Sequence, residues 1–247
     1  MNYSNESKAL ATSLDNINTI FFDLGDTLGK IDYPVPEIWL AAAAEHGLSL
    51  QRDALLEALK AADQIYNPKV YEYKGRMPEF WFLYDAYVLN RLGVVDRDGD
   101  LSRAIGLAFL DVTKQHTRVF PETHSVLSKL KQRGYALGII SNNTDEIFDR
   151  MRNLDLIRYF DTITYSQEAG AEKPDPAPFK LALSRAGRSP NKCLHVGDSY
   201  AMDVVGARGV GIEPILVDRK MKYSRTNCVT IRNLNGILGE SQPSLAP

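Results

Sequence analysis

The chain opens with one hydrophobic pattern and then changes to another. Three consecutive apolar residues, Ile20, Phe21 and Phe22, precede Asp23, as is typical of a β-strand buried on both faces. After Leu28, apolar positions recur at intervals of three and four residues. This spacing predicts four helices, over 37–46, 55–65, 80–91 and 101–112. Proline and glycine residues separate these segments.

From Pro121 onward, short apolar strands alternate with helices, which indicates a parallel sheet covered by helices. We expect helices over 122–132, 145–154, 177–186 and 201–207, and strands over 135–140, 162–165, 193–196 and 215–217, with 228–231 as a candidate edge strand. The predicted fold is therefore α/β, with a doubly wound parallel sheet formed by 17–31 and 119–240. An all-helical domain, 32–118, is inserted in it, and polar tails cover 1–16 and 241–247.

Composition narrows the classes of function. With 247 residues, 44% of them hydrophobic, the chain is long enough to bury a core. A net charge of −2 with both signs interspersed argues against a nucleic-acid partner. No apolar run approaches the roughly 18 residues that span a membrane. Two cysteines, Cys193 and Cys228, form no disulfide framework, and the start lacks a signal-peptide pattern, so we expect a cytoplasmic protein with no membrane partner.

Polar residues lie at the ends of three predicted strands and in the loop before the helix predicted over 177–186. Because the carboxyl ends of parallel strands meet at one edge of a sheet, we expect these side chains to converge there. Each residue taken alone also fits a helix cap or a solvated loop charge. The residues are Asp23, Ser141, Asn142, Lys173, Asp198 and Asp203.

These residue types suit phosphoryl transfer. A carboxylate such as Asp23 can attack as a covalent nucleophile. Mg²⁺ prefers oxygen ligands, which Asp23, Asp198 and the carbonyl of Gly25 can supply. Lys173 and Ser141 provide a cation and a donor for the phosphoryl oxygens.

Four segments in order resemble the motifs of the haloacid dehalogenase-like (HAD) hydrolase superfamily, in the IA-like subclass with a helical cap between the first and second motifs. The segments are 22–28, 140–142, 173–176 and 197–203. The resemblance implies a Rossmann-like core and a small phosphorylated substrate, and it makes Asp23 and Lys173 catalytic. It also implies that Ser141, Asn142, Lys173 and Thr27 hold the phosphate, and that Asp23, Gly25, Asp198 and Asp203 hold Mg²⁺.

One position departs from the family pattern. Phosphatases of the family carry an aspartate two residues after the nucleophile, which protonates the leaving oxygen, whereas this chain has Gly25 there and Asp26 one residue later. Strand alternation predicts that Asp26 points away, although a turn at Gly25 would make it a candidate acid/base. Loss of a general acid costs about 10² to 10⁴ in rate, so we predict weakened activity, most of all on alkyl phosphates.

Three functions stay open. The first is a Mg²⁺-dependent phosphatase that passes through an aspartyl-phosphate on Asp23. The second is a metal-independent 2-haloacid dehalogenase, since a halide leaves without a proton. The third is a nearly inactive protein that binds a phosphorylated ligand or a protein partner. We further expect His195 to pack inside the core, and Trp39 and Trp81 to lie in the core of the cap.

Overall fold

The structure is a computed structural model that describes residues 16–66, 69, 72–73, 76–224 and 226–239. The predicted tails lie outside these residues, except for Asn16. The chain divides into two compact units: a core unit, which holds the chain up to Lys30 and from Val119 onward, and a helical unit, Ile31–Arg118.

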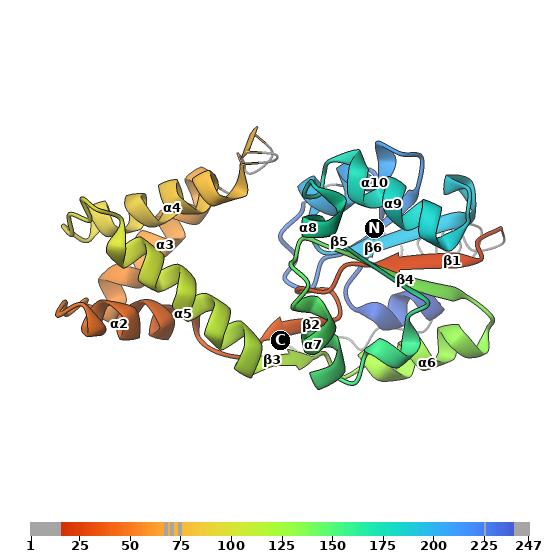
Figure 1. Cartoon of the computed structure of the whole chain (residues 1–247), viewed down its shortest axis with the longest axis horizontal. Helices are drawn as coiled ribbons and strands as arrows, with labels where there is room; N and C mark the ends of the chain where they lie inside the picture. Colours follow the sequence, from red (N-terminus) through yellow and green to blue (C-terminus); the bar gives the residue numbers. More distant parts are fainter. Residues whose placement is uncertain (1–15, 67–68, 70–71, 74–75, 225, 240–247) are drawn as a thin grey trace. The chain divides into compact units, whose positions relative to one another are not determined.

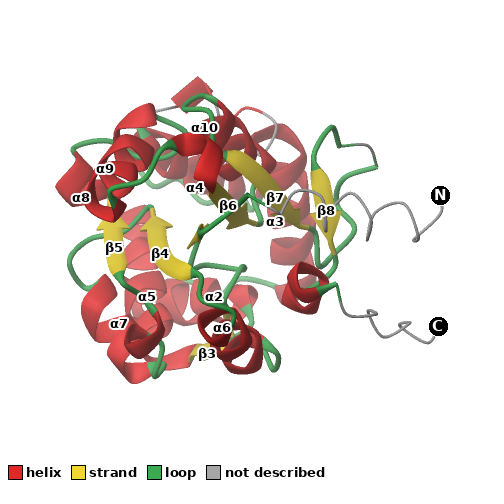
Figure 2. Ribbon diagram, turned by 90° about the vertical axis from the view of Figure 1, so that its right-hand side faces the viewer, coloured by secondary structure: helices red, strands yellow, loops and turns green. Residues whose placement is uncertain are grey.

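The core unit is built on a six-stranded sheet in which every strand pair is parallel, in the order β5-β4-β1-β6-β7-β8. Figure 2 shows helices above and below these strands, which confirms the predicted doubly wound parallel sheet. The strands are β1 (Thr19–Phe22), β4 (Ala136–Ser141), β5 (Thr162–Tyr165), β6 (Cys193–Gly197), β7 (Glu213–Val217) and β8 (Val229–Ile231).

β1 is a central strand of the sheet (Figure 1). Its side chains point alternately to the two faces and contribute to both layers of the core. Ile20 and Phe22 belong to the cluster that includes side chains of α6 (Thr123–Gln132), α7 (Ile147–Asn153) and the 3-10 helix η5 (Leu234–Leu238). Phe21 lies in the cluster formed with α9 (Pro176–Ala186) and α10 (Val205–Arg208). Because both faces of β1 are covered, its sequence is a continuous apolar run.

Several short elements differ from the predictions. The expected helix over 201–207 is a π-helical turn, η4 (Tyr200–Val204), followed by α10. A short helix, α8 (Ser166–Ala169), follows β5. Where the chain passes between the units, β2 (Gly29–Ile31) and β3 (Thr117–Val119) pair as a two-stranded sheet. Strands of three residues are too short to reveal a period of two in the sequence.

The helical unit contains the helices α2 (Val35–Glu45), α3 (Arg52–Tyr66), α4 (Met77–Arg91) and α5 (Asp100–His116) among its described residues. Trp39 is buried in the core of this unit, as predicted. The same prediction for Trp81 is wrong, because its side chain is 53% exposed. Phe80 and Tyr84 occupy the buried face of α4, and Trp81, the residue after Phe80, is turned about 100° away from it.

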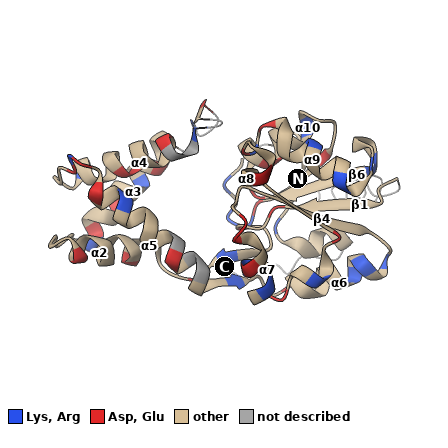
Figure 3. Ribbon diagram, in the orientation of Figure 1, with Lys and Arg blue, Asp and Glu red and all other residues tan. Residues whose placement is uncertain are grey.

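Acidic and basic residues are interspersed along the ribbons of both units (Figure 3). None of the helices in the described part of the chain combines the length and the apolar composition that crossing a membrane requires.

Candidate active site

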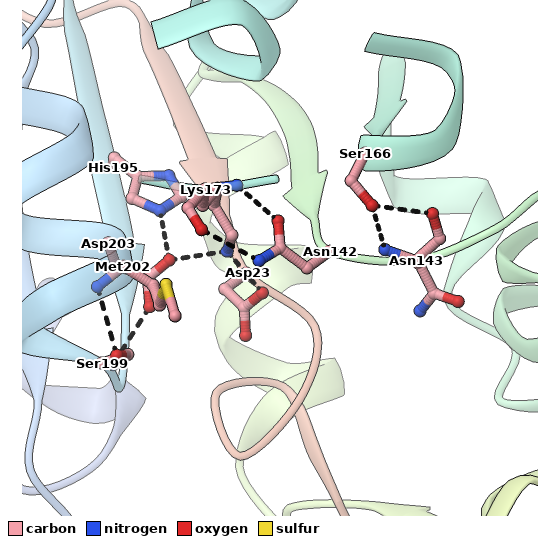
Figure 4. A network of polar contacts seen from close by, with 9 residues as sticks. All are labelled: Asp23, Asn142, Asn143, Ser166, Lys173, His195, Ser199, Met202 and Asp203. Carbon is pink, nitrogen blue, oxygen red and sulfur yellow. Dashed lines mark hydrogen bonds and ion pairs between the residues drawn. The ribbon is translucent and has the colours of Figure 1, made fainter. Parts of the chain in front are cut away.

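Lys173 lies at the centre of a buried ionic network at the carboxyl edge of the sheet (Figure 4). Its ammonium nitrogen is 2.7 Å from Oδ1 of Asp23 and 2.6 Å from Oδ1 of Asp203. The pKa of Lys173 is raised because the attraction of the two carboxylates outweighs burial, which acts in the opposite direction. Lys173 therefore stays charged while it holds both aspartates in place.

Asn142 fixes the backbone of this lysine. The Lys173 amide donates a hydrogen bond to Oδ1 of Asn142 (2.7 Å), and Nδ2 of Asn142 donates to the Lys173 carbonyl (3.1 Å). Because both ends of the Asn142 amide are engaged, the loop after β4 and the loop before α9 are joined beside Asp23.

Asp203 is braced by both of its oxygens. Besides Lys173, Oδ1 accepts a hydrogen bond from Nε2 of His195 (2.9 Å), and Oδ2 accepts one from the Ser199 amide (3.0 Å). His195 is fully buried in β6, as predicted, and because a carboxylate only accepts, its Nε2 carries the proton. Burial raises the pKa of Asp203, but Lys173 and His195 together bring it below its usual value. A Cβ at Gly197 would lie 2.2 Å from Cγ of Asp203, so this packing requires glycine.

Three carboxylates crowd this site. Asp23, Asp198 and Asp203 can each place an oxygen within 4.8 Å of the others. Burial, followed by repulsion from Asp203, Asp23 and Asp26, raises the pKa of Asp198 to about 8. Burial also raises the pKa of Asp23, against the pull of Lys173. Hard carboxylate oxygens with excess negative charge form a donor set that fits Mg²⁺.

A pocket of about 230 Å³ opens over this network. It lies at the ends of β1, β4 and β6, and it brings together most of the residues that the sequence singled out. The lining residues include Asp23, Gly25, Ser141, Asn142, Lys173, Asp198 and Asp203. A depression of about 540 Å³ in the helical unit is lined by Leu40, Ala44 and residues 47–50, none of which ionises.

Two sequence candidates do not line this pocket. Asp26 is exposed and has a positive φ of 50°, while its charge still acts on Asp198. Thr27 is fully buried, and its hydroxyl finds no hydrogen-bond partner among the described residues. The predicted site residues also leave out four lining residues, Asn143, Arg150, Ser199 and Met202. Arg150 of α7 was missed because an arginine in a predicted helix carries no signal that separates it from a surface charge.

The comparison with known proteins assigns the family. The family model described as haloacid dehalogenase-like hydrolase matches residues 17–211, most of the chain. The chain belongs to the haloacid dehalogenase-like hydrolases. This confirms the resemblance inferred from the four motifs and makes the protein a hydrolase.

Relatives within the family carry two kinds of name. Haloacid dehalogenase-like hydrolase domain-containing protein 3 of Bos taurus is 30% identical over 206 residues, which are 81% of this chain and 82% of that protein. Glyceraldehyde 3-phosphate phosphatase of Methanothermobacter thermautotrophicus is 30% identical over 224 residues, 89% of this chain and 93% of that protein. The magnesium-bound crystal form of YfnB from Bacillus subtilis has the same fold, with a TM-score of 0.71 at 21% identity, covering 90% of this chain and 97% of YfnB.

Proposed function

We propose that this hydrolase is a Mg²⁺-dependent phosphatase that acts on a small phosphorylated metabolite through an aspartyl-phosphate on Asp23. The observation that carries the proposal is the environment of this carboxylate. Lys173 binds its Oδ1, while Oδ2 accepts no hydrogen bond from another described residue and remains available to the pocket. The phosphatase name of a relative that covers 89% of this chain supports the same reaction class.

The charge balance of the site supports a divalent cation. Three carboxyl groups lie close together here, and the repulsion among them, which helps to raise the pKa of Asp198, would be relieved by a divalent cation. Asp23, Asp198 and the carbonyl of Gly25 would hold the ion, whereas both oxygens of Asp203 already bind protein groups. Bound there, Mg²⁺ would offset the repulsion between the attacking carboxylate and the phosphate.

The residues of the chain account for the steps of such a reaction. An oxygen of Asp23 attacks phosphorus, the bond from phosphorus to the leaving oxygen breaks, and that oxygen takes up a proton. Water then attacks the phosphorus of the aspartyl-phosphate and restores the Asp23 carboxylate. Lys173 keeps the nucleophile oriented, and the Ser141 hydroxyl, which lines the pocket, would donate to a phosphoryl oxygen.

Among the described residues, neither position 25 nor position 26 places an acid in the pocket to protonate the leaving oxygen. Gly25 lines the pocket without a side chain, and Asp26 is exposed outside the pocket lining. Substrates whose leaving oxygen is weakly basic, such as acyl and aryl phosphates, should therefore react fastest. In this proposal the helical unit acts as the cap that selects the substrate.

The test is a turnover assay on p-nitrophenyl phosphate, acetyl phosphate and sugar phosphates, with Mg²⁺ or with EDTA. We expect Mg²⁺-dependent release of phosphate that Asp23→Asn abolishes. The matched control is Asp149→Asn, which removes an exposed carboxylate paired with Arg152 and should leave turnover intact. No Mg²⁺-dependent turnover on any of these substrates would overturn the proposal.

Gly25 also favours a second candidate function, that of a metal-independent 2-haloacid dehalogenase, since a departing halide needs no general acid. Chloride release from 2-chloropropionate in the presence of EDTA would select it. A third outcome is a protein that binds a phosphorylated ligand without reaction. Normal ligand affinity with no turnover, and no gain of rate in Gly25→Asp, would identify that case.

A further inference from the structure

Arg150 is a basic side chain of the pocket that the proposed mechanism does not use. The described basic residues that line the pocket are Lys173 and Arg150. Two of the three N–H donors of Lys173 are used by carboxylates at 2.7 and 2.6 Å. Arg150 is only partly exposed, and the structure records no hydrogen bond from its guanidinium to another described residue. Its N–H donors are therefore available to a ligand.

Arg150 is not part of the ionic network formed by Lys173 with the aspartates of the pocket. Burial lowers the pKa of Arg150, and among the described groups Glu146, one helical turn earlier, is the charge that opposes this effect. Among the described residues, no ion pair joins Arg150 to Asp23, Asp198 or Asp203, whereas Lys173 contacts two of these carboxylates. The guanidinium is thus partly desolvated at the pocket wall, but outside the ionic network that surrounds the nucleophile.

The order of the strands shows from which side the Arg150 side chain reaches the pocket. It is the fourth residue of α7, and long helical side chains point back toward the start of their helix, which here follows the loop after β4. In the sheet, β4 and β6 lie on opposite sides of β1. Arg150 and Asp198 therefore reach the pocket from opposite sides of Asp23, so the guanidinium flanks the position of a phosphoryl group away from the candidate Mg²⁺ site.

We propose that Arg150 binds a second anionic group of the substrate, so that the natural substrate is a small organic phosphate that also carries a carboxylate or a second phosphate. The planar guanidinium fork suits either group, because both present two acceptor oxygens side by side. The inference rests on the proposed phosphatase function. In addition, the second anionic group of the substrate would bind close to the reacting phosphoryl group, because both would occupy one pocket of about 230 Å³.

An alternative role for Arg150 is a simple surface ion pair with Glu146, but that role does not explain why its side chain lines the pocket. A Glu four residues before an Arg stabilises a helix surface by only about 0.2 to 0.5 kcal/mol, and such a pair needs no pocket. Arg152 on the same helix forms a surface pair of this general kind, since it is exposed and pairs with Asp149, three residues earlier. It is therefore the matched control for Arg150.

The experiment measures inhibition constants against turnover of p-nitrophenyl phosphate. One pair of competitors is 2-phosphoglycolate and 2-hydroxyethyl phosphate, which differ in a carboxylate; ethane-1,2-diol bisphosphate tests a second phosphate. We expect the wild type to bind at least one of the two competitors with a second anionic group about 10- to 100-fold more tightly than 2-hydroxyethyl phosphate, the range for a charged hydrogen-bond partner. This preference should disappear in Arg150→Gln, be reduced in Arg150→Lys, and persist in Arg152→Gln.

A wild-type protein without this preference, or a preference that survives in Arg150→Gln, would overturn the inference. Equal weakening of all three competitors in Arg150→Gln would also overturn it, since that result assigns Arg150 to the reacting phosphoryl group. If p-nitrophenyl phosphate is not turned over, the phosphatase proposal fails separately. Calorimetry with the same compounds, on Asp23→Asn with and without Arg150→Gln, then still decides whether Arg150 recognises the second anion.

Discussion

Restoring a carboxylic acid at position 25 should convert a specialised site into a general phosphatase site. Position 25 lies two residues after Asp23 and lines the pocket. A Cβ built on Gly25 meets no atom within 4 Å, and the backbone there does not have a positive φ. Gly25→Asp can therefore be accommodated without strain, and its effect on the free energy of unfolding should stay within about 1 kcal/mol.

The local charges favour the acid form of the new side chain. Burial and neighbouring carboxylates already raise the pKa of Asp198 to about 8. An aspartate added at position 25 would lie near the same carboxylates, whose repulsion acts to raise its pKa. A positioned general acid contributes about 10² to 10⁴ in rate, or roughly 3 to 5.5 kcal/mol of activation free energy.

The assay compares kcat/KM for an alkyl phosphate, glycerol 1-phosphate, with that for p-nitrophenyl phosphate at saturating Mg²⁺. We expect Gly25→Asp to raise the alkyl rate by at least about 100-fold, and the aryl rate far less, because nitrophenolate leaves without protonation. Gly25→Asn is the control of matched size that cannot act as an acid. An unchanged alkyl rate in folded Gly25→Asp, or the same gain in Gly25→Asn, would refute the reasoning.

Three further predictions concern the framework of the site and of the helical unit. Lys173→Met should abolish turnover and lower the free energy of unfolding by about 3 to 5 kcal/mol, measured by urea denaturation, because it leaves Asp23 and Asp203 buried without their cation. Gly197→Ala should cost about 1 to 3 kcal/mol in the same assay and reduce kcat, since its Cβ would overlap Asp203; full stability would contradict the packing described. Asp96 accepts hydrogen bonds from the amides of Leu101 and Ser102 at the start of α5, and these bonds lower its pKa against the effect of partial burial. Asp96→Ala should therefore destabilise the helical unit by about 1 kcal/mol at pH 7. In thermal melts, this difference between wild type and variant should vanish as the pH falls through the lowered pKa of Asp96. A difference that stays constant with pH would argue that the hydrogen bonds of Asp96 to the start of α5 do not stabilise the helix.

The central strand and its catalytic edge could be predicted because burial and strand order are both visible in the sequence. A run without polar residues requires cover on both faces, and the crossover rule then places the ends of β1, β4 and β6 at one edge. Asp23, Ser141 and Asp198 follow directly from this logic. Lys173 could be located in the same way, since its loop precedes a helix that packs on the sheet.

The sequence did not predict on which face of a helix certain side chains lie. Whether Arg150 faces the pocket or solvent is decided by the residue at which α7 begins, and the predicted start at 145 differs from the observed Ile147. An error of two residues rotates every side chain by about 200°, which exchanges the two faces of a helix. The exposure of Trp81 was missed for a related reason. Besides the buried row of Phe80, Tyr84 and Val88, α4 carries apolar residues on its other sides, so residue type alone did not separate Trp81 from the buried face.

The contrast between Asp198 and Asp203 shows how local geometry separates two acids that look equivalent in one motif. The π-helical turn η4 brings the amides of Asp203 and Val204 to the Ser199 carbonyl, at 2.8 and 3.3 Å. This wide turn directs the Asp203 side chain back to His195 and Lys173, where both of its oxygens are used. Asp198, which follows β6, is buried among other aspartates, and their effect on its pKa outweighs the opposing effect of Lys222. Asp203 therefore holds Lys173, which contacts Asp23, whereas Asp198 is the acid that the proposed function assigns to the ion. This difference follows from the extra residue in a single helical turn.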